Sequence, residues 1–575
     1  MHKLRAIVAR TLMVGSCLLL SPGYAVGQSY DDLVNLFFEF REFQQATITE
    51  GVPDYTEAAM QDQYRGLEEF QSNLAGIDTA EWPVWQQVDY HLVRAEMNAL
   101  EFHHKEHRPW SRDPGFYSMF EGDAGASINA PDFFGPIYDL FGFSDDGPEP
   151  SDEEDDDSLS LSDEQQAALR NTLEGIPAIY AQARENLTEP AADFAEFAIR
   201  NFVEERELYE EAAELLAADY PELAELALQA SESVEDYRQW LESNQGDMAP
   251  NAGLGKDNYD WWMRNVQLSP WGWEETNQII EREYDRIISF LKLEENRNKH
   301  LPPLEVAMSE RAWFESMREA LHHVVDFMRD EELMTVEDWV DPADYYARGP
   351  RGSSEELDDS VSERLLPQNS SIDTKVRQRE ILPGEAHEYV GHMLDYQRQE
   401  RLTQSPIRSA GRRFNMGSMR LEGWAVALEE LLMQAGVLDA RPRNGREMEY
   451  LMNASHMSLG IPDLKMHANE IDLTEARHLC AQIMPRGWTR PDERMVWFEM
   501  QSNLRNPGGF HSSNVVAGKA YFMKMFREQA QALGDDFVIR DFVDAFLSSG
   551  TIPMSLIRWE MTGNSDDVML ETQSL

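Results

Sequence analysis

Apolar residues recur at intervals of three and four along much of this chain, and this spacing predicts helices. Over these stretches the polar residues fall on the opposite face. No comparable set of segments alternates apolar and polar residues as half-buried strands do, although short strands near Ile381 are left open. The predicted fold class is mainly α. The pattern is clearest over four segments: 31–45, 167–187, 207–241 and 275–293.

The charge of the chain limits its partners. The formal net charge is −55, so the surface repels nucleic acid and anionic membranes. Residues 144–163 combine aspartate and glutamate with proline, glycine and serine, which predicts a solvated acidic loop between helices. A calcium site is the alternative there, but the spaced aspartates of a calcium-binding loop are missing.

The N-terminus has the pattern of a targeting segment. Basic residues precede an apolar run over residues 11–20, and small residues follow at 25–27. We expect a signal peptide over residues 1–27 and a periplasmic or secreted protein, with a lipoprotein anchored through Cys17 as the less favoured alternative. No later segment reaches eighteen apolar residues, so no transmembrane segment is predicted. After cleavage only Cys480 is left, which excludes an internal disulfide and a cysteine-ligated zinc.

The strongest chemical signal is the run HEYVGH over residues 387–392. In the common HExxH motif the histidines lie four residues apart, so that one helix face carries both to a zinc ion. Here His387 and His392 lie five apart. An ideal helix would turn the second imidazole about 100° further, so both can bind one metal only if the helix carries a one-residue bulge. Gly391 lies where such a bulge would form.

Zinc chemistry explains these residue types. A catalytic zinc binds three protein ligands and a water, and neutral imidazoles suit it. Glu388 is placed to take a proton from that water. The third ligand is predicted in a helix that ends near Gly436, where Glu422 and Glu429 lie seven apart and share a face. One of the two could bind the metal while the other orients a ligand histidine. A decayed, metal-free site is the main alternative.

Two segments, HEYVGHMLDYQ and EGWAVALEE, resemble motifs of the bacterial DUF885 family, HE-x-x-PGHH-x-Q and EGW-x-x-x-x-E. The resemblance covers roughly the last 320 residues, including a Gly-Lys step at 518–519. DUF885 is regarded as a mostly helical group of gluzincin-type zinc metallopeptidases. It implies that His387, His392 and Glu422 bind Zn²⁺, that Glu388 is the catalytic base, and that Glu429 supports the site from the second shell.

A further family element, D-x-G-x-H, matches Asp463 and His467, with Lys465 in place of the glycine. The resemblance implies that His467 donates to the oxyanion of the tetrahedral intermediate, supported by Asp463; an ordinary packed histidine is the alternative. The chain lacks the proline and second histidine of the family's first motif, so its spacing is similar to the HExxGH of dipeptidyl peptidase III. The family's tyrosine after PGQ is absent and its arginine is out of register, with Arg505 nearby. These departures leave the predicted metal ligands in place and would alter substrate specificity or the stabilisation of the transition state.

Other histidines carry weaker signals. His103 and His107 have a spacing that could hold a metal at the surface, but no acidic motif accompanies them. His322 and His323 lie in an apolar helical segment, where packing is expected.

We expect a large, two-lobed helical protein with a deep central cleft. Residues 28–250 would form one wall, and residues 251–575 the floor with the zinc site and the opposite wall. Such a cleft admits short peptides and excludes folded proteins. The predicted function is an exported zinc metallopeptidase that hydrolyses short peptides. The alternatives are a zinc hydrolase of non-peptide amides or esters, and a catalytically degenerate peptide-binding protein. The sequence does not fix the oligomeric state.

Overall fold

A computed structural model describes residues 29–49, 51–119, 133–141, 159–347, 357, 359–402, 404–508 and 513–569. The expected signal peptide, Cys17 and residues 144–158 of the acidic loop lie outside these ranges. The described chain is mainly helical, as predicted, and its one sheet pairs two short antiparallel strands, β1 (Ile48–Thr49) and β2 (Val52–Pro53). The segment after Ile381, where strands were left open, is helical.

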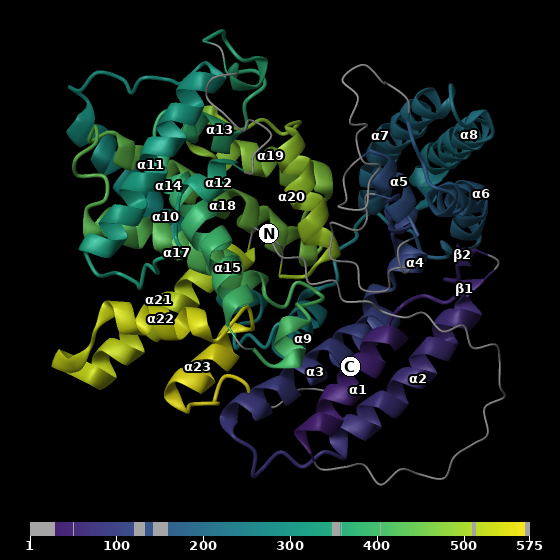
Figure 1. Ribbon diagram of the computed structural model, residues 1–575, viewed down its shortest axis with the longest axis horizontal. Helices are drawn as coiled ribbons and strands as arrows, with labels where there is room; N and C mark the ends of the chain where they lie inside the picture. Colours follow the sequence, from purple (N-terminus) through teal and green to yellow (C-terminus); the bar gives the residue numbers. More distant parts are fainter. Residues whose placement is uncertain are drawn as a thin grey trace.

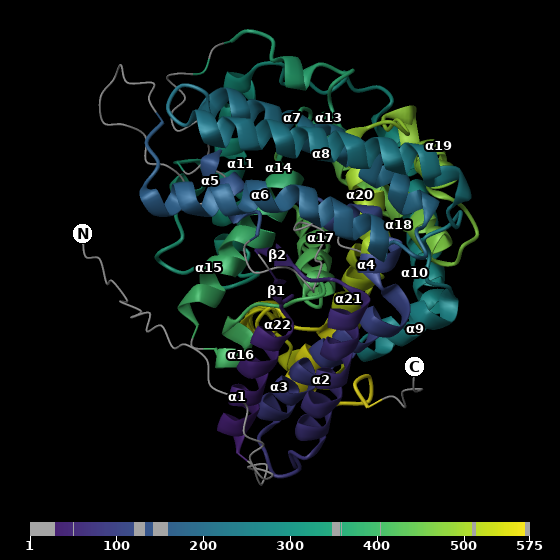
Figure 2. The same cartoon turned by 90° about the vertical axis from the view of Figure 1, so that its right-hand side faces the viewer.

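The N-terminal helices form two groups in Figure 1. Helices α1 to α3 lie together, and α6, α7 and α8 form a layer that is seen face-on in Figure 2, where α8 packs against both α6 and α7. The predicted segment 207–241 is divided between α7 and α8, because Pro221 occupies the first turn of α8. The helices are α1 (Tyr30–Phe43), α2 (Glu57–Ala75), α3 (Val84–Phe102), α4 (Pro109–Arg112), α5 (Gly135–Leu140), α6 (Asp163–Asn186), α7 (Ala192–Leu216) and α8 (Pro221–Asn244), with the π-helix η1 (His103–His107) and the 3₁₀ turns η2 (Pro114–Tyr117) and η4 (Gln245–Asp247).

The C-terminal helices occupy the left side of Figure 1. The longest are α10, α11, α17, α18 and α21, and α17 packs against α21. The helices are α9 (Lys256–Asn265), α10 (Trp273–Asn298), α11 (Glu310–Asp330), α12 (Ala343–Ala347), α13 (Ile372–Arg377), α14 (Leu382–Glu385), α15 (Leu394–Arg401), α16 (Pro406–Ser409), α17 (Ser418–Ala435), α18 (Gly445–His467), α19 (Leu473–Ile483), α20 (Arg494–Arg505), α21 (Ser513–Leu533), α22 (Ile539–Ser548) and α23 (Met554–Thr562), with the π-helix η6 (Ala386–Met393) and the 3₁₀ turns η5 (Glu363–Leu365), η7 (Pro485–Gly487) and η8 (Gly534–Asp536).

The hydrophobic core is shared by both parts of the chain. One cluster of buried apolar side chains runs from Leu33 in α1 to Val568, beyond α23. In a second cluster, Phe194 of α7 packs with Cys480 of α19 and Met500 of α20. Cys480 is fully buried, as expected. The N-terminal helices therefore pack onto the helices that carry the predicted site.

Two features fix α17, the helix predicted to supply the third ligand. Its glycine Gly423 contacts Gly518 of α21 so closely that an added Cβ would lie 2.5 Å from the Gly518 backbone. Arg420 forms a fully buried ion pair with Asp395 of α15, with Nη2 donating to Oδ1 over 3.0 Å. The helix ends at Gly436, where φ is 107°, a left-handed conformation that favours glycine. This confirms the predicted end of the helix.

Candidate metal centre

Both motif histidines lie in the π-helix η6. In a π-helix each N–H bonds to the carbonyl five residues back rather than four, so residues five apart return to the same side. The two Nε2 atoms of His387 and His392 are 2.9 Å apart, and the rings cross at 83°. The bulge that the five-residue spacing predicts is therefore confirmed.

Gly391 has a packing role at this point of the helix. A Cβ added there would lie 2.7 Å from Cβ and 3.0 Å from Cα of Ala425. The backbone of η6 thus crosses α17 with no room for a side chain. Glycine at this position lets the helix with the histidines approach the helix with the glutamates.

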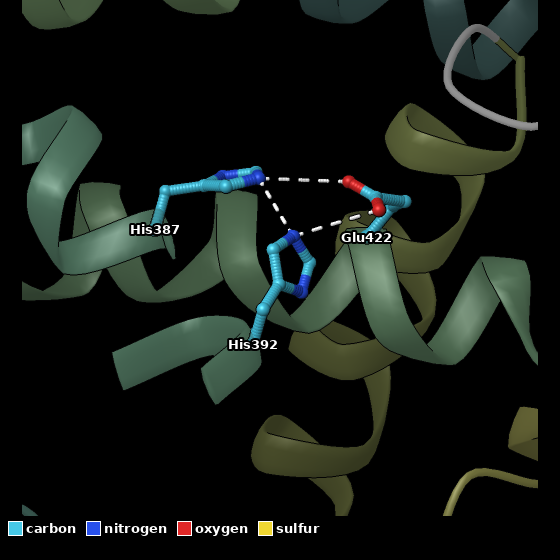
Figure 3. Close-up of side chains that lie close together, drawn as sticks. All are labelled: His387, His392 and Glu422. Carbon is cyan, nitrogen blue, oxygen red and sulfur yellow. Dashed lines mark hydrogen bonds and ion pairs between the residues drawn. The ribbon is translucent and has the colours of Figure 1, made fainter. Parts of the chain in front are cut away.

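The carboxylate of Glu422 completes a three-residue group. Its Oε2 lies 3.5 Å from Nε2 of His387, and its Oε1 lies 3.5 Å from Nε2 of His392. Figure 3 shows the two rings and the carboxylate directed at one another. One ligand atom from each residue lies within 4.8 Å of the others. Two imidazole nitrogens and a carboxylate oxygen are a donor set that fits a catalytic zinc.

Glu429 contacts the other side of His387. Its Oε1 lies 2.6 Å from Nδ1 of that histidine, and its side chain is 1% exposed. A carboxylate on Nδ1 keeps the proton there and directs Nε2 toward the metal position. The sequence left open which of the two glutamates faces the metal position, and in the structure Glu422 does.

The electrostatics of this group favour a cation. Burial alone would lower the pKa of His387, but the carboxylates of Glu422 and Glu429 outweigh that effect and hold its pKa well above the ordinary value. The two carboxylates stabilise positive charge at the imidazole. The same field would favour a divalent ion beside Nε2.

Glu388 is the most exposed member of the motif. Its side chain is 45% exposed, and its Oε1 lies 3.6 Å from Nη1 of Arg377. Arg377 is itself 13% exposed and pairs with Glu385 at 2.5 Å. A carboxylate open to solvent and held beside a cation can exchange protons with water. Sequence reasoning missed Arg377, which precedes the motif by ten residues and belongs to no recognised pattern.

His467 and Asp463 are fully buried in α18. Nε2 of His467 lies 3.0 Å from the carbonyl oxygen of Asn503 and 3.5 Å from Oδ1 of Asp463. Burial lowers the pKa of His467 to about 4 and raises the pKa of Asp463 to about 7. His467 is therefore a neutral imidazole at neutral pH. It is not part of the three-residue group, and its predicted role at the oxyanion stays a prediction.

Three other residues considered from the sequence are buried in the structure. His103 and His107 lie in η1 and are buried, so they cannot form a metal site at the surface. Arg505 is buried and makes a two-point ion pair with Asp113, with distances of 2.6 Å and 3.1 Å. This pair joins α20 to the N-terminal part of the chain.

The fold and the site thus define a mainly helical protein in which a π-helix brings two histidines to a glutamate. A family model described as "Bacterial protein of unknown function (DUF885)" matches residues 385–561, which include all three residues. This match supports the resemblance to DUF885 that the motifs indicate. A search of curated proteins finds no match.

Two solved structures share the fold. One is that of a "putative lipoprotein of unknown function" from Shewanella oneidensis, with a TM-score of 0.68 and 16% sequence identity, covering 93% of this chain and 100% of that chain. The other is that of the "putative lipoprotein" from Colwellia psychrerythraea, with a TM-score of 0.64 and 12% identity, covering 93% of this chain and 99% of that chain. At these identities the similarity concerns the fold alone.

Proposed function

We propose that this chain is an exported zinc-dependent metallopeptidase that hydrolyses peptide bonds in short peptides. The observation that carries the proposal is the π-helix η6, which joins the Nε2 atoms of His387 and His392 to the carboxylate of Glu422. A π-helix is rare and tends to occur at functional sites. The pairing of Glu429 with Nδ1 of His387 adds the outer support that metal-binding histidines have.

In this proposal each residue has a defined task. His387, His392 and Glu422 hold Zn²⁺, which supplies Lewis-acid chemistry by lowering the pKa of water and polarising a carbonyl. Glu388 takes a proton from the attacking water and gives it to the leaving amine. The resemblance to DUF885 implies that His467 donates to the developing oxyanion, which is worth about 3 kcal/mol for such a donor. For this role the N–H that faces the carbonyl oxygen of Asn503 in the structure must change its partner.

The substrate class rests on the resemblance to DUF885, and we propose that a cleft between the N-terminal and C-terminal helices admits short peptides. A zinc hydrolase acting on other amides or esters would use the same residues. A degenerate peptide-binding protein is the third alternative, and the presence of a solvent-accessible Glu388 beside His387 argues against it. The charge of −55 argues against nucleic-acid partners.

Export is also a proposal. Among the described residues, no helix is both long and apolar enough to span a membrane. The two structural neighbours are called lipoproteins, which supports export and strengthens the alternative of an anchor at Cys17.

The proposal is tested by measuring metal content and peptide turnover on one preparation of the exported form, with and without chelator. Glu388→Gln should abolish turnover and leave zinc binding intact, because it removes the proton acceptor and no ligand. Glu400→Gln, an exposed change on the next helix, is the charge-matched control. One zinc per chain with turnover lost to chelator and to Glu388→Gln would support the metallopeptidase. Zinc without turnover on a broad peptide library would favour the other two functions, and absence of zinc would refute all metal-dependent ones.

A further inference from the structure

A chain of buried polar side chains extends from His387 into the core, away from the metal position. It begins at Glu429, whose Oε1 contacts Nδ1 of His387. The carboxyl of Glu429 lies within hydrogen-bonding reach of that of Glu449, a fully buried residue of α18. One oxygen of each, Oε2 of Glu429 and Oε2 of Glu449, is buried and has no N–H donor.

Two buried carboxyls in contact do not both ionise, because like charges at this distance in a low-dielectric interior repel strongly. One shared proton removes the repulsion and satisfies both oxygens. Glu429 already lies against Nδ1 of His387, which makes it the acceptor of that contact. Burial, followed by the charge of Glu429, raises the pKa of Glu449 well above its ordinary value. Both observations place the proton on Glu449.

Lys519 of α21 determines which oxygen of Glu449 carries that proton. Its ammonium can only donate, and its Nζ lies 2.6 Å from Oδ1 of Asn453. The amide of Asn453 must therefore point its Nδ2 the other way, where it lies 2.7 Å from Oε1 of Glu449. Oε1 is thus an acceptor, and the hydroxyl is Oε2, the oxygen left without an N–H donor.

The remaining charges around Lys519 balance one another. Its Nζ lies 2.5 Å from Glu430 and 3.1 Å from Glu283, and Arg286 contacts both of these carboxylates. Lys519 is 4% exposed, and the glycine before it, Gly518, allows α21 to contact α17. Lys519 therefore stays charged in the core and holds Asn453 in one orientation.

We propose that Glu449 is a positioning residue for the metal centre: its Oε2–H donates to Glu429, which fixes Glu429 as the acceptor for Nδ1–H of His387 and so presents Nε2 to the metal. The inference rests on the proposed function, because it assigns a purpose to an arrangement behind a metal ligand. The proton on Oε2 of Glu449 is expected with or without the metal.

The test compares two substitutions at this position. Glu449→Gln keeps the pattern, since its amide N–H can donate to Glu429 and its carbonyl can accept from Asn453; zinc affinity should stay within about threefold of the wild type. Glu449→Met removes both and should weaken zinc binding about 10- to 100-fold, the usual effect of losing outer support for a metal ligand. Glu447→Gln is the control, because Glu447 lies on the same helix but pairs with Asn298 and Arg486.

Affinity is measured by competition with a fluorescent zinc chelator, and folding by circular dichroism. Wild-type affinity in the methionine variant, or equal losses in both variants, would overturn the inference. The zinc-free protein provides a second readout. Because other buried carboxyls such as Asp463 also keep a proton near neutral pH, this readout is a difference: the wild type should show an infrared band of a protonated carboxyl that is lost in Glu449→Gln and kept in Glu447→Gln. Absence of that difference overturns the inference even if Glu449→Met fails to fold. If the difference is present but the wild type binds no zinc, the proton is supported and the proposed metal function fails.

Discussion

Replacing Gly391 by alanine tests whether the crossing of η6 and α17 determines the metal centre. The added Cβ would lie 2.7 Å from Cβ of Ala425, whereas ordinary contact begins near 3.4 Å, so the two helices must separate by about 0.7 Å. The neighbouring residue His392 would move with η6, away from Glu422 on α17. Metal–ligand distances tolerate about 0.2 Å. A separation of this size is therefore large for the centre.

We expect Gly391→Ala to weaken zinc binding about 10- to 100-fold, as when the support of a ligand is lost. Overpacking at the crossing should also lower the free energy of unfolding by about 1–3 kcal/mol. Both quantities can be measured on one preparation, by chelator competition and by urea unfolding. Gly246→Ala is the control, because that glycine has open space around it and no left-handed φ.

A second substitution identifies the cause. Ala425→Gly removes the side chain that the new Cβ meets, at a cost of about 1 kcal/mol for glycine within a helix. If the clash is responsible, the double variant Gly391→Ala/Ala425→Gly should bind zinc more tightly than Gly391→Ala alone. The recovery should be partial, because Cα of Ala425 would still lie 3.0 Å from the added Cβ. Wild-type affinity in the single variant, or no recovery in the double, would show that the crossing does not control the metal position.

Two further predictions concern the site and its surroundings. His392→Ala should abolish both zinc binding and peptide hydrolysis, since it removes a ligand; equilibrium dialysis that still found one tightly bound zinc per chain would exclude His392 as a ligand. Asp463→Asn should alter the pH dependence of stability. Burial raises the pKa of Asp463 to about 7, so the stabilisation from its retained proton is complete below about pH 4, the unfolded value, and is lost as the pH rises through about 7. Urea unfolding between about pH 5 and 8 should show the asparagine variant gaining on the wild type as the pH rises, by about 3 kcal/mol over this range; parallel curves would contradict this.

The helices and the bulge could be predicted from the sequence for clear physical reasons. Helical periodicity follows from which face is buried, so the segments 31–45 and 275–293 correspond to α1 and α10. The five-residue spacing of His387 and His392 can serve one metal only through a π turn, and η6 is that turn. A helix commonly ends in a left-handed residue, which favours glycine, and the sequence has glycine at 436, where α17 ends.

Other parts of the site depend on tertiary contacts that no local pattern encodes. Glu422 and Glu429 share a helix face, so spacing alone could not decide which one faces the metal position. Glu449 and Lys519 are far apart in the sequence and meet behind Glu429 only because α17, α18 and α21 pack together. A lysine or glutamate in an ordinary helix predicts a solvated face, whereas these two are buried.

The shared core has a consequence for how this protein can be divided. The matched segment, residues 385–561, contains the candidate centre, but residues outside it form part of its core. Expressed alone, it would expose the apolar cluster around Met500 that Phe194 covers, and Arg505 would lose its buried partner Asp113. We expect such a fragment to aggregate rather than fold. Gene fusion or recombination could therefore transfer the centre to another protein only by carrying the N-terminal helices with it.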